Sequence, residues 1–113
     1  MINIYGIKTC SSVRKAIKFC KDYELEYSFI DFRATPLESE KVQYFASKID
    51  INILFNNRGT KYKDLKLKEL NLDDDGKLEW LCKENMLLKR PIVEYNDNVL
   101  VAFNEEEYKE KLL

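Results

Sequence analysis

The hydrophobic and polar positions in the first third of the chain predict a strand, a helix and a second strand. Residues 2–5 are mostly apolar, which indicates a short strand. From residue 13 to residue 20 the apolar side chains recur at the i, i+3, i+4, i+7 spacing of one helical face. The helix is predicted to begin at Ser11 or Ser12, because either serine can cap it. Residues 27–31 form the second predicted strand.

The middle of the chain is predicted to be helical, in short pieces. A helix opens at Pro36 and continues to about Lys48. Between Ile51 and Asn85 further helical pieces are separated by turns, which the sequences NNRG at residues 56–59 and DDDG at residues 73–76 indicate. We therefore expect a helical insertion at about residues 37–86.

The last third predicts a β-hairpin and a closing helix. Strands at residues 91–95 and 99–102 flank a turn at residues 96–98. Asn104, with Glu107 three residues later, forms a capping box that opens the last helix.

The predicted order of elements is β-α-β, a helical middle and then β-β-α. This is the order of a thioredoxin-like fold, an α/β class with a four-stranded mixed sheet. In such a fold the first two strands are parallel and joined by a right-handed crossover, and the closing hairpin adds two antiparallel strands. Residues 1–113 are therefore predicted to form a single thioredoxin-like domain that carries the helical insertion.

The composition is that of an ordinary globular domain and excludes several classes of partner. Of 113 residues, 45% are hydrophobic and 35% are charged, and the formal net charge is −1. This charge does not predict nucleic-acid binding. The apolar runs are too short to span a bilayer, and the N-terminus lacks the pattern of a secretory signal. We therefore expect a cytoplasmic monomer without a membrane partner.

Cysteine is the residue type that carries candidate chemistry, and histidine is absent. The three cysteines are Cys10, Cys20 and Cys82, an odd number without the spacing of a disulfide framework. Val13 stands where the second cysteine of a C-x-x-C motif would be. Without histidine there is no Cys–His nucleophile pair, no Ser–His–Asp triad and no His-ligated zinc. We expect no metal site and no bound cofactor, and any reactive cysteine needs another means of activation.

Cys10 has such a means, because it directly precedes a predicted helix. The positive end of the helix dipole and the unpaired amides of Ser11 and Ser12 favour the thiolate, which is the nucleophilic form. Arg14 lies one turn along the helix and Lys8 precedes the cysteine, so both add positive charge. The same amides can hold an oxyanion or the carboxylate of a thiol substrate.

Position alone leaves the role of Cys10 open, because a lone cysteine is usually a small buried residue. Cys20 belongs to the apolar helix face and Cys82 follows Trp80 and Leu81 in a helix, so both are interpreted as structural. No resolving cysteine for Cys10 is evident. A catalytic cycle would therefore need an external thiol, such as glutathione, as a co-substrate.

Two further stretches contain arginines with alternative interpretations. Arg90 is either a surface residue or points at an anion near Cys10, and Pro91 after it opens a strand. Only about 5–6% of X–Pro bonds are cis, so Pro91 alone predicts a trans proline at an edge strand. Arg58, in the NNRGT turn, and Arg33, after the second strand, are either solvated or part of a partner-binding face.

Five segments of the chain together resemble the arsenate reductase (ArsC)/Spx family. They are YGIKTCSSVRKA, DFRATPL, LFNNRGTKY, LLKRPIVEY and VLVAFNEEEYKEKL, in the family's order and over nearly the whole chain. The combination of YGIKTC, DFR, NNRGT and KRP is most similar to the YffB-like subgroup.

This resemblance implies a thioredoxin-like fold with a nucleophile at Cys10 and a cis-proline at Pro91. It implies that Arg90 assists anion binding, and we expect Arg14 and Arg58 beside the bound anion or glutathione. In the family's arsenate reductases the cysteine attacks arsenate, and glutathione and glutaredoxin release the product. For the YffB-like branch the implied activity is glutathione-dependent thiol reduction.

The chain departs from the family pattern at three positions. Arsenate reductases carry a further arginine after the last strand, where this chain has Phe103, and the offset of Arg58 within its turn also differs. Spx regulators usually carry a C-x-x-C switch and bind the C-terminal domain of the RNA polymerase α subunit, and Val13 breaks that switch. We expect a single-cysteine, glutathione-dependent thiol oxidoreductase. An Spx-type regulator and an arsenate reductase are the alternatives.

Overall fold

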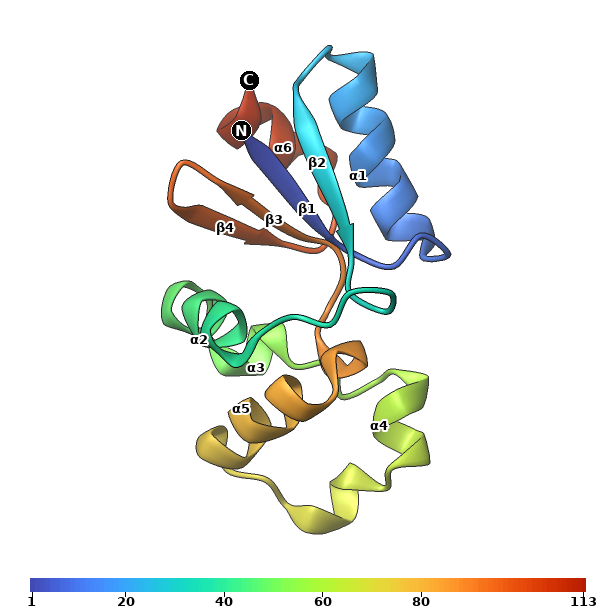
Figure 1. Ribbon diagram of the computed structural model, residues 1–113, viewed down its shortest axis with the longest axis vertical. Coiled ribbons are helices and arrows are strands. Elements are labelled where there is room, and N and C mark those ends of the chain that lie inside the picture. The colour runs from blue at the N-terminus through green and yellow to red at the C-terminus, as the bar shows by residue number, and fades with distance from the viewer. The chain divides into compact units, whose positions relative to one another are not determined.

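The computed structural model describes residues 1–113, which divide into two compact units (Figure 1). The first unit comprises Met1–Thr35 and Arg90–Leu113. The second is Pro36–Lys89, the helical segment that the sequence places at about residues 37–86.

The first unit is built on a four-stranded mixed sheet in the order β2-β1-β3-β4 (Figure 1). The strands are β1 (Ile2–Gly6), β2 (Tyr27–Asp31), β3 (Ile92–Tyr95) and β4 (Asn98–Val101). β1 and β2 are parallel, with Ile2 opposite Tyr27 and Gly6 opposite Asp31, whereas β3 is antiparallel to both β1 and β4. This arrangement confirms the predicted thioredoxin-like α/β fold.

Two helices pack on the sheet of the first unit. α1 (Ser11–Asp22) connects β1 to β2, and α6 (Glu105–Leu112) follows β4. The core that they form with the sheet consists of Ile2, Ile4, Ala16, Phe19, Cys20, Val93, Leu100 and Tyr108. The rings of Phe19 and Tyr108 meet edge to face at 5.5 Å, and the Tyr108 hydroxyl donates to the Ala102 carbonyl at 2.9 Å. The predicted apolar face of α1, Cys20 included, is therefore the face that packs into the core.

The β3–β4 hairpin turns over two residues. Asn96 and Asp97 have φ angles of 44° and 63°, in the left-handed region that asparagine and aspartate tolerate better than most residues. Tyr95 pairs with Asn98, so Asn98 is the first residue of β4. The prediction that Asn98 belongs to the turn is therefore wrong.

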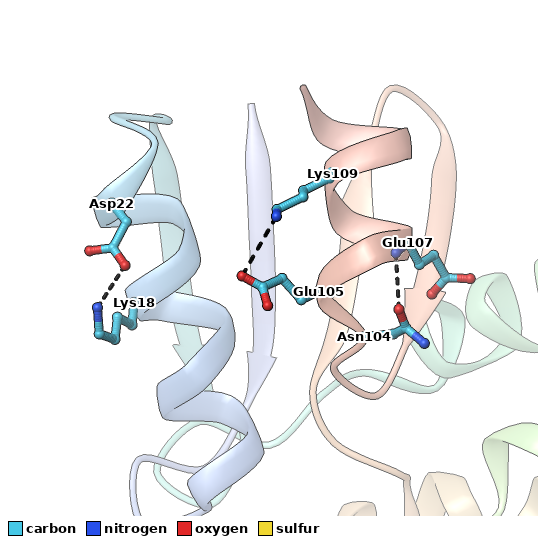
Figure 2. A network of polar contacts seen from close by, with 6 residues as sticks. All are labelled: Lys18, Asp22, Asn104, Glu105, Glu107 and Lys109. Carbon is cyan, nitrogen blue, oxygen red and sulfur yellow. Dashed lines mark hydrogen bonds and ion pairs between the residues drawn. The ribbon is translucent and has the colours of Figure 1, made fainter.

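The N-terminus of α6 carries the predicted asparagine cap. The Asn104 side chain accepts a hydrogen bond from the Glu107 backbone N–H at 3.0 Å (Figure 2). Figure 2 also shows the i,i+4 ion pairs Lys18–Asp22, at 2.6 Å, and Lys109–Glu105, at 4.0 Å. All four of these charged side chains are exposed, so the two pairs contribute little to stability.

The second unit consists of short helices, as the sequence predicts. They are α2 (Ser39–Lys48), α3 (Ile51–Leu54), α4 (Thr60–Asp64) and α5 (Asp74–Lys83), with 3₁₀ turns η1 (Leu67–Leu70) and η2 (Asn85–Leu87). Their core includes Val42, Phe45, Leu54, Leu81 and Leu87, all fully buried. The one buried polar residue is Asn85, whose amide accepts from the Leu37 N–H at 2.8 Å and donates to the Leu81 carbonyl at 3.0 Å.

Two predicted boundaries in this unit are wrong, and one turn is confirmed. α2 begins at Ser39, with Glu38 at its N-cap, and not at Pro36. DDDG is not a turn: the Asp73 carboxylate accepts from the Gly76 N–H at 2.8 Å and thereby caps the start of α5. The NNRG turn is present, and the Asn56 side chain accepts from the Arg58 N–H at 3.1 Å.

None of the helices combines the length and the hydrophobicity that crossing a bilayer requires.

Candidate active site

Cys10 lies where the chain turns from β1 into α1. The Cys10 N–H donates to the Ile7 carbonyl at 3.2 Å, which closes a four-residue turn. Cys10 is the N-cap of α1, with extended φ and ψ angles of −81° and 127°. Its carbonyl accepts from the Arg14 N–H at 3.1 Å, the first bond of the helix. Ser11 and Ser12 are therefore the first two helical residues, and the prediction that either serine caps the helix is wrong.

This position gives the Cys10 thiol the electrostatics of a helix N-terminus. The thiol makes no capping hydrogen bond, and the first turn of α1 contains no acidic residue that would offset the positive end of the helix dipole. The N-terminus of α1 thus presents a positive partial charge to the Cys10 side chain. Cys10 is partly exposed.

Arg14 folds back over the turn that precedes Cys10. Its Nε donates to the Lys8 carbonyl and its Nη2 to the Thr9 carbonyl, both at 3.2 Å. The guanidinium therefore holds two carbonyls of the turn and keeps its positive charge beside them. The sequence predicts Arg14 beside an anion, and the structure adds this contact with the turn.

Asp31, at the end of β2, also forms a hydrogen bond with this turn. One carboxylate oxygen accepts from the Lys8 N–H at 3.2 Å and the other from the Arg33 N–H at 2.9 Å. Desolvation acts to raise the pKa of Asp31, but hydrogen bonds from the amides of Lys8, Arg33 and Ala34, with the Arg33 charge, hold it below its ordinary value. Asp31 is not among the site residues that the sequence predicts. Its place at the end of the second predicted strand does indicate such a role, because the carboxyl ends of adjacent parallel strands meet at one edge of a sheet.

Gly6 sets how closely α1 approaches the end of β1. A Cβ atom at Gly6 would lie 2.5 Å from Cγ2 of Val13, a fully buried residue in the first turn of α1. Only glycine permits this approach, because the branched valine side chain has little freedom to move away. The position of Cys10 above the sheet therefore depends on the Gly6–Val13 contact.

Pro91 and Arg90 stand next to the same end of β1. Tyr5 pairs with Ile92, so Pro91, directly before β3, lies beside the end of the strand that leads to Cys10. The Arg90–Pro91 peptide bond is cis, as the family resemblance implies. Pro91 is buried and its carbonyl accepts from the Ala102 N–H at 2.8 Å, whereas Arg90 is half-buried.

The other predicted site residue and the other cysteines have different surroundings. Arg58 is exposed in the NNRG turn of the second unit. Cys20 is buried, and this burial raises the pKa of its thiol. Cys82 is half-buried near the C-terminal end of α5, which is the negative end of the helix dipole. Cys10 is thus the cysteine that combines access with a helix N-terminus. The structure brings together no group of three or more potential metal ligands.

Phe103 occupies the region in which arsenate reductases carry a further arginine. Its ring packs edge to face against Tyr108 at 5.0 Å and against Phe19 at 6.5 Å. This region of the first unit is therefore part of an aromatic cluster.

The sequence and the fold agree in their comparison with known proteins. The profile of the ArsC family matches residues 5–111. The chain belongs to the ArsC family. An uncharacterised protein of Haemophilus influenzae is 34% identical over 110 residues, which cover 96% of each chain. The global transcriptional regulator Spx of Streptococcus pyogenes is 22% identical over 111 residues, covering 96% of this chain and 83% of the regulator.

Two solved structures have the same fold as this chain. A Staphylococcus aureus protein, solved by NMR, is 37% identical, with a TM-score of 0.80 over 97% of both chains. A protein named YffB superposes over 100% of both chains with a TM-score of 0.92, at 24% identity. The second likeness extends the agreement in fold to every element of the chain.

Proposed function

We propose that this ArsC-family chain is a single-cysteine thiol oxidoreductase that works with glutathione. One observation carries the proposal: Cys10 is the partly exposed N-cap of α1, on a turn that Arg14 and Asp31 hold from two sides. Membership of the family supports Cys10 as the nucleophile.

The reaction that fits one cysteine proceeds through a mixed disulfide. The Cys10 thiolate attacks the glutathione sulfur of a glutathionylated thiol, breaks the S–S bond and releases the substrate as a thiolate. A second glutathione thiolate then attacks the glutathione sulfur of the Cys10–glutathione disulfide. This step restores the Cys10 thiolate and releases oxidised glutathione, so the net reaction is a disulfide exchange in which one free glutathione takes over the glutathione of the substrate disulfide and the substrate leaves as a thiolate.

Binding of glutathione is assigned to groups around Cys10. The amides of Ser11 and Ser12, at the positive end of α1, suit a glutathione carboxylate. Arg14 adds charge beside the turn. For Arg58 and Arg90 the support is the family resemblance, and glutaredoxin is a candidate partner for reducing the mixed disulfide on the same grounds.

The proposal predicts a glutathione adduct that depends on one cysteine. Oxidised glutathione is added to the protein at pH 7, and the intact mass shows whether a single adduct forms. We expect the adduct in wild type, Cys20→Ser and Cys82→Ser, and its loss in Cys10→Ser. An adduct that persists in Cys10→Ser would overturn the proposal, as would a wild-type protein that forms none.

Arsenate reduction is a weaker alternative because Phe103 replaces an arginine with a packed aromatic ring. A coupled assay with glutathione, glutaredoxin and NADPH separates the two activities. We expect no arsenate-dependent oxidation of NADPH. Arsenate-dependent turnover that Cys10→Ser abolishes would establish the alternative.

A regulatory role of Spx type is the second candidate, favoured by the likeness to Spx over 96% of this chain. Such a protein would bind the C-terminal domain of the RNA polymerase α subunit without needing catalysis. Val13 argues against a redox switch of the Spx kind, because this fully buried valine occupies the position of the second switch cysteine. Binding of that domain by both wild type and Cys10→Ser at moderate salt would support it, and absence of binding would exclude it.

A further inference from the structure

The second unit contains a cavity that the chemistry of Cys10 does not use. It measures about 260 Å³ and lies among α3, α4, η1 and the start of α5. This volume is slightly below the range of about 300–1,000 Å³ that is usual for drug-sized ligands, so the cavity suits a small molecule.

One side of this cavity is apolar and contains two aromatic rings. Phe55 and Leu67 are almost fully buried, with 3% and 1% of their surface exposed. Tyr62, half-buried in α4, meets the Phe55 ring edge to face at 5.9 Å. Phe55 fixes the Tyr62 ring in this way, and the half-buried face of Tyr62 is the surface that a flat apolar group can contact.

The polar residues of the cavity are rich in hydrogen-bond donors. The Lys77 ammonium donates to the Asn52 side-chain oxygen at 2.6 Å. This bond occupies the acceptor of Asn52, so its NH₂ group remains a donor, and Lys77 keeps two further N–H groups. Lys68, on η1, adds a second ammonium.

The charge of the lining has one sign. Two lysines and three asparagines line the cavity, and no aspartate or glutamate does. Asp50 and Asp73, whose carboxylates accept from the N–H groups of Asn52 and Gly76 at 2.8 Å, lie outside the lining. In a chain with a net charge of −1, this donor-rich, cationic lining favours an anion.

We propose that this cavity binds a small organic anion that carries a carboxylate on a flat apolar group. The apolar group packs against Tyr62, and the carboxylate accepts from Lys77, Lys68 and the Asn52 amide. The proposal is independent of the reaction at Cys10, so Cys10→Ser binds the same anion unchanged.

Benzoate is the probe, and benzamide is its neutral counterpart of nearly equal shape. Titration of the ¹⁵N-labelled protein with benzoate should produce saturable shifts of the Asn52, Phe55 and Asn71 amide signals. Benzamide should bind at least about tenfold more weakly. A charge-assisted hydrogen bond is roughly twice as strong as a neutral one, and this difference in free energy corresponds to about a tenfold difference in affinity.

Variants test whether the named lysines are responsible. Lys77→Gln and Lys68→Gln should each weaken benzoate binding by about tenfold, which is the usual effect of losing one such bond. Lys63→Gln is the matched control, because Lys63 is exposed on α4 and lies outside the lining. The proposal is overturned if benzoate causes no saturable shifts, if benzamide binds equally well, or if Lys63→Gln weakens binding as much as Lys77→Gln.

Discussion

Asp31 holds both the turn that leads to Cys10 and the chain that leaves β2. Its two carboxylate oxygens accept from the backbone N–H groups of Lys8 and Arg33. These bonds are stronger to the carboxylate than to the protonated carboxyl group, which is why they lower its pKa despite the opposing effect of desolvation. The charge state of this one residue therefore bears on stability and on the geometry before Cys10.

We predict that Asp31→Asn lowers the free energy of unfolding at pH 7 by about 1 kcal/mol, a value that partial exposure limits. A carboxyl whose pKa is lower in the folded state stabilises the protein above its unfolded pKa of about 3.9. This stabilisation disappears as the pH falls through the lower folded pKa. Urea unfolding at pH 7 and at pH 2–3 should show the difference between wild type and variant shrinking in acid.

Asp22→Asn is the matched control for this prediction. Asp22 is exposed and pairs with Lys18 within one helix, so its loss should lower the stability much less than the loss of Asp31. Equal stability of wild type and Asp31→Asn at pH 7 would contradict the proposed role of Asp31.

Single residues show which parts of the site the sequence can predict. Cys10 at a helix start follows from local signals, since an apolar strand and a helical pattern flank it within a few residues. The Asp31 contact joins residues 23 positions apart, and it exists because β1 and β2 pair in parallel. The bonds of Arg14 to the Lys8 and Thr9 carbonyls depend on how that turn folds, so charge and spacing alone could not predict them.

At the level of elements, the junction of β1 and α1 depends on one close contact. We predict that Gly6→Ala destabilises the protein by about 1–3 kcal/mol, because the added methyl group overlaps the Val13 side chain. Urea unfolding of Gly6→Ala, Val13→Ala and the double variant measures this overlap. Gly6→Ala should cost less in the Val13→Ala background. Additive costs would contradict a steric clash between these two positions.

The errors in predicting elements have a common physical origin. Aspartate, asparagine and serine favour turns and helix caps for the same reason, because their side chains bond to nearby backbone amides. DDDG was therefore predicted to be a turn, although Asp73 caps α5 with that bond. At α1 the N-cap is Cys10 and not a serine, because the turn that starts at Ile7 closes at Cys10.

For the molecule as a whole, the order of elements was sufficient to predict the sheet. Its parallel β1–β2 pair and its antiparallel hairpin follow from a βαβ crossover and a short turn. The cavity of the second unit could not be predicted, since it results from the packing of short helices whose ends local patterns do not determine.

Buried Cys20 should report the opening of the first unit. Its side chain lies in the core, and burial raises the pKa of its thiol, so alkylation requires unfolding. We predict that iodoacetamide labels Cys20 in the native protein far more slowly than Cys10, and that urea removes the difference. Gly6→Ala should accelerate Cys20 labelling about tenfold for each 1.4 kcal/mol of lost stability. Equal labelling of Cys20 and Cys10 without urea would contradict the packing described.

The central claim is that Cys10 is an activated nucleophile, and its rate of alkylation at pH 7 tests this most directly. The wild-type protein is treated with iodoacetamide, and peptide mapping follows each cysteine beside free cysteine at the same concentration. The position of Cys10 at the N-terminus of α1 predicts that it reacts faster than free cysteine and faster than Cys82. A Cys10 that reacts no faster than free cysteine would contradict the account.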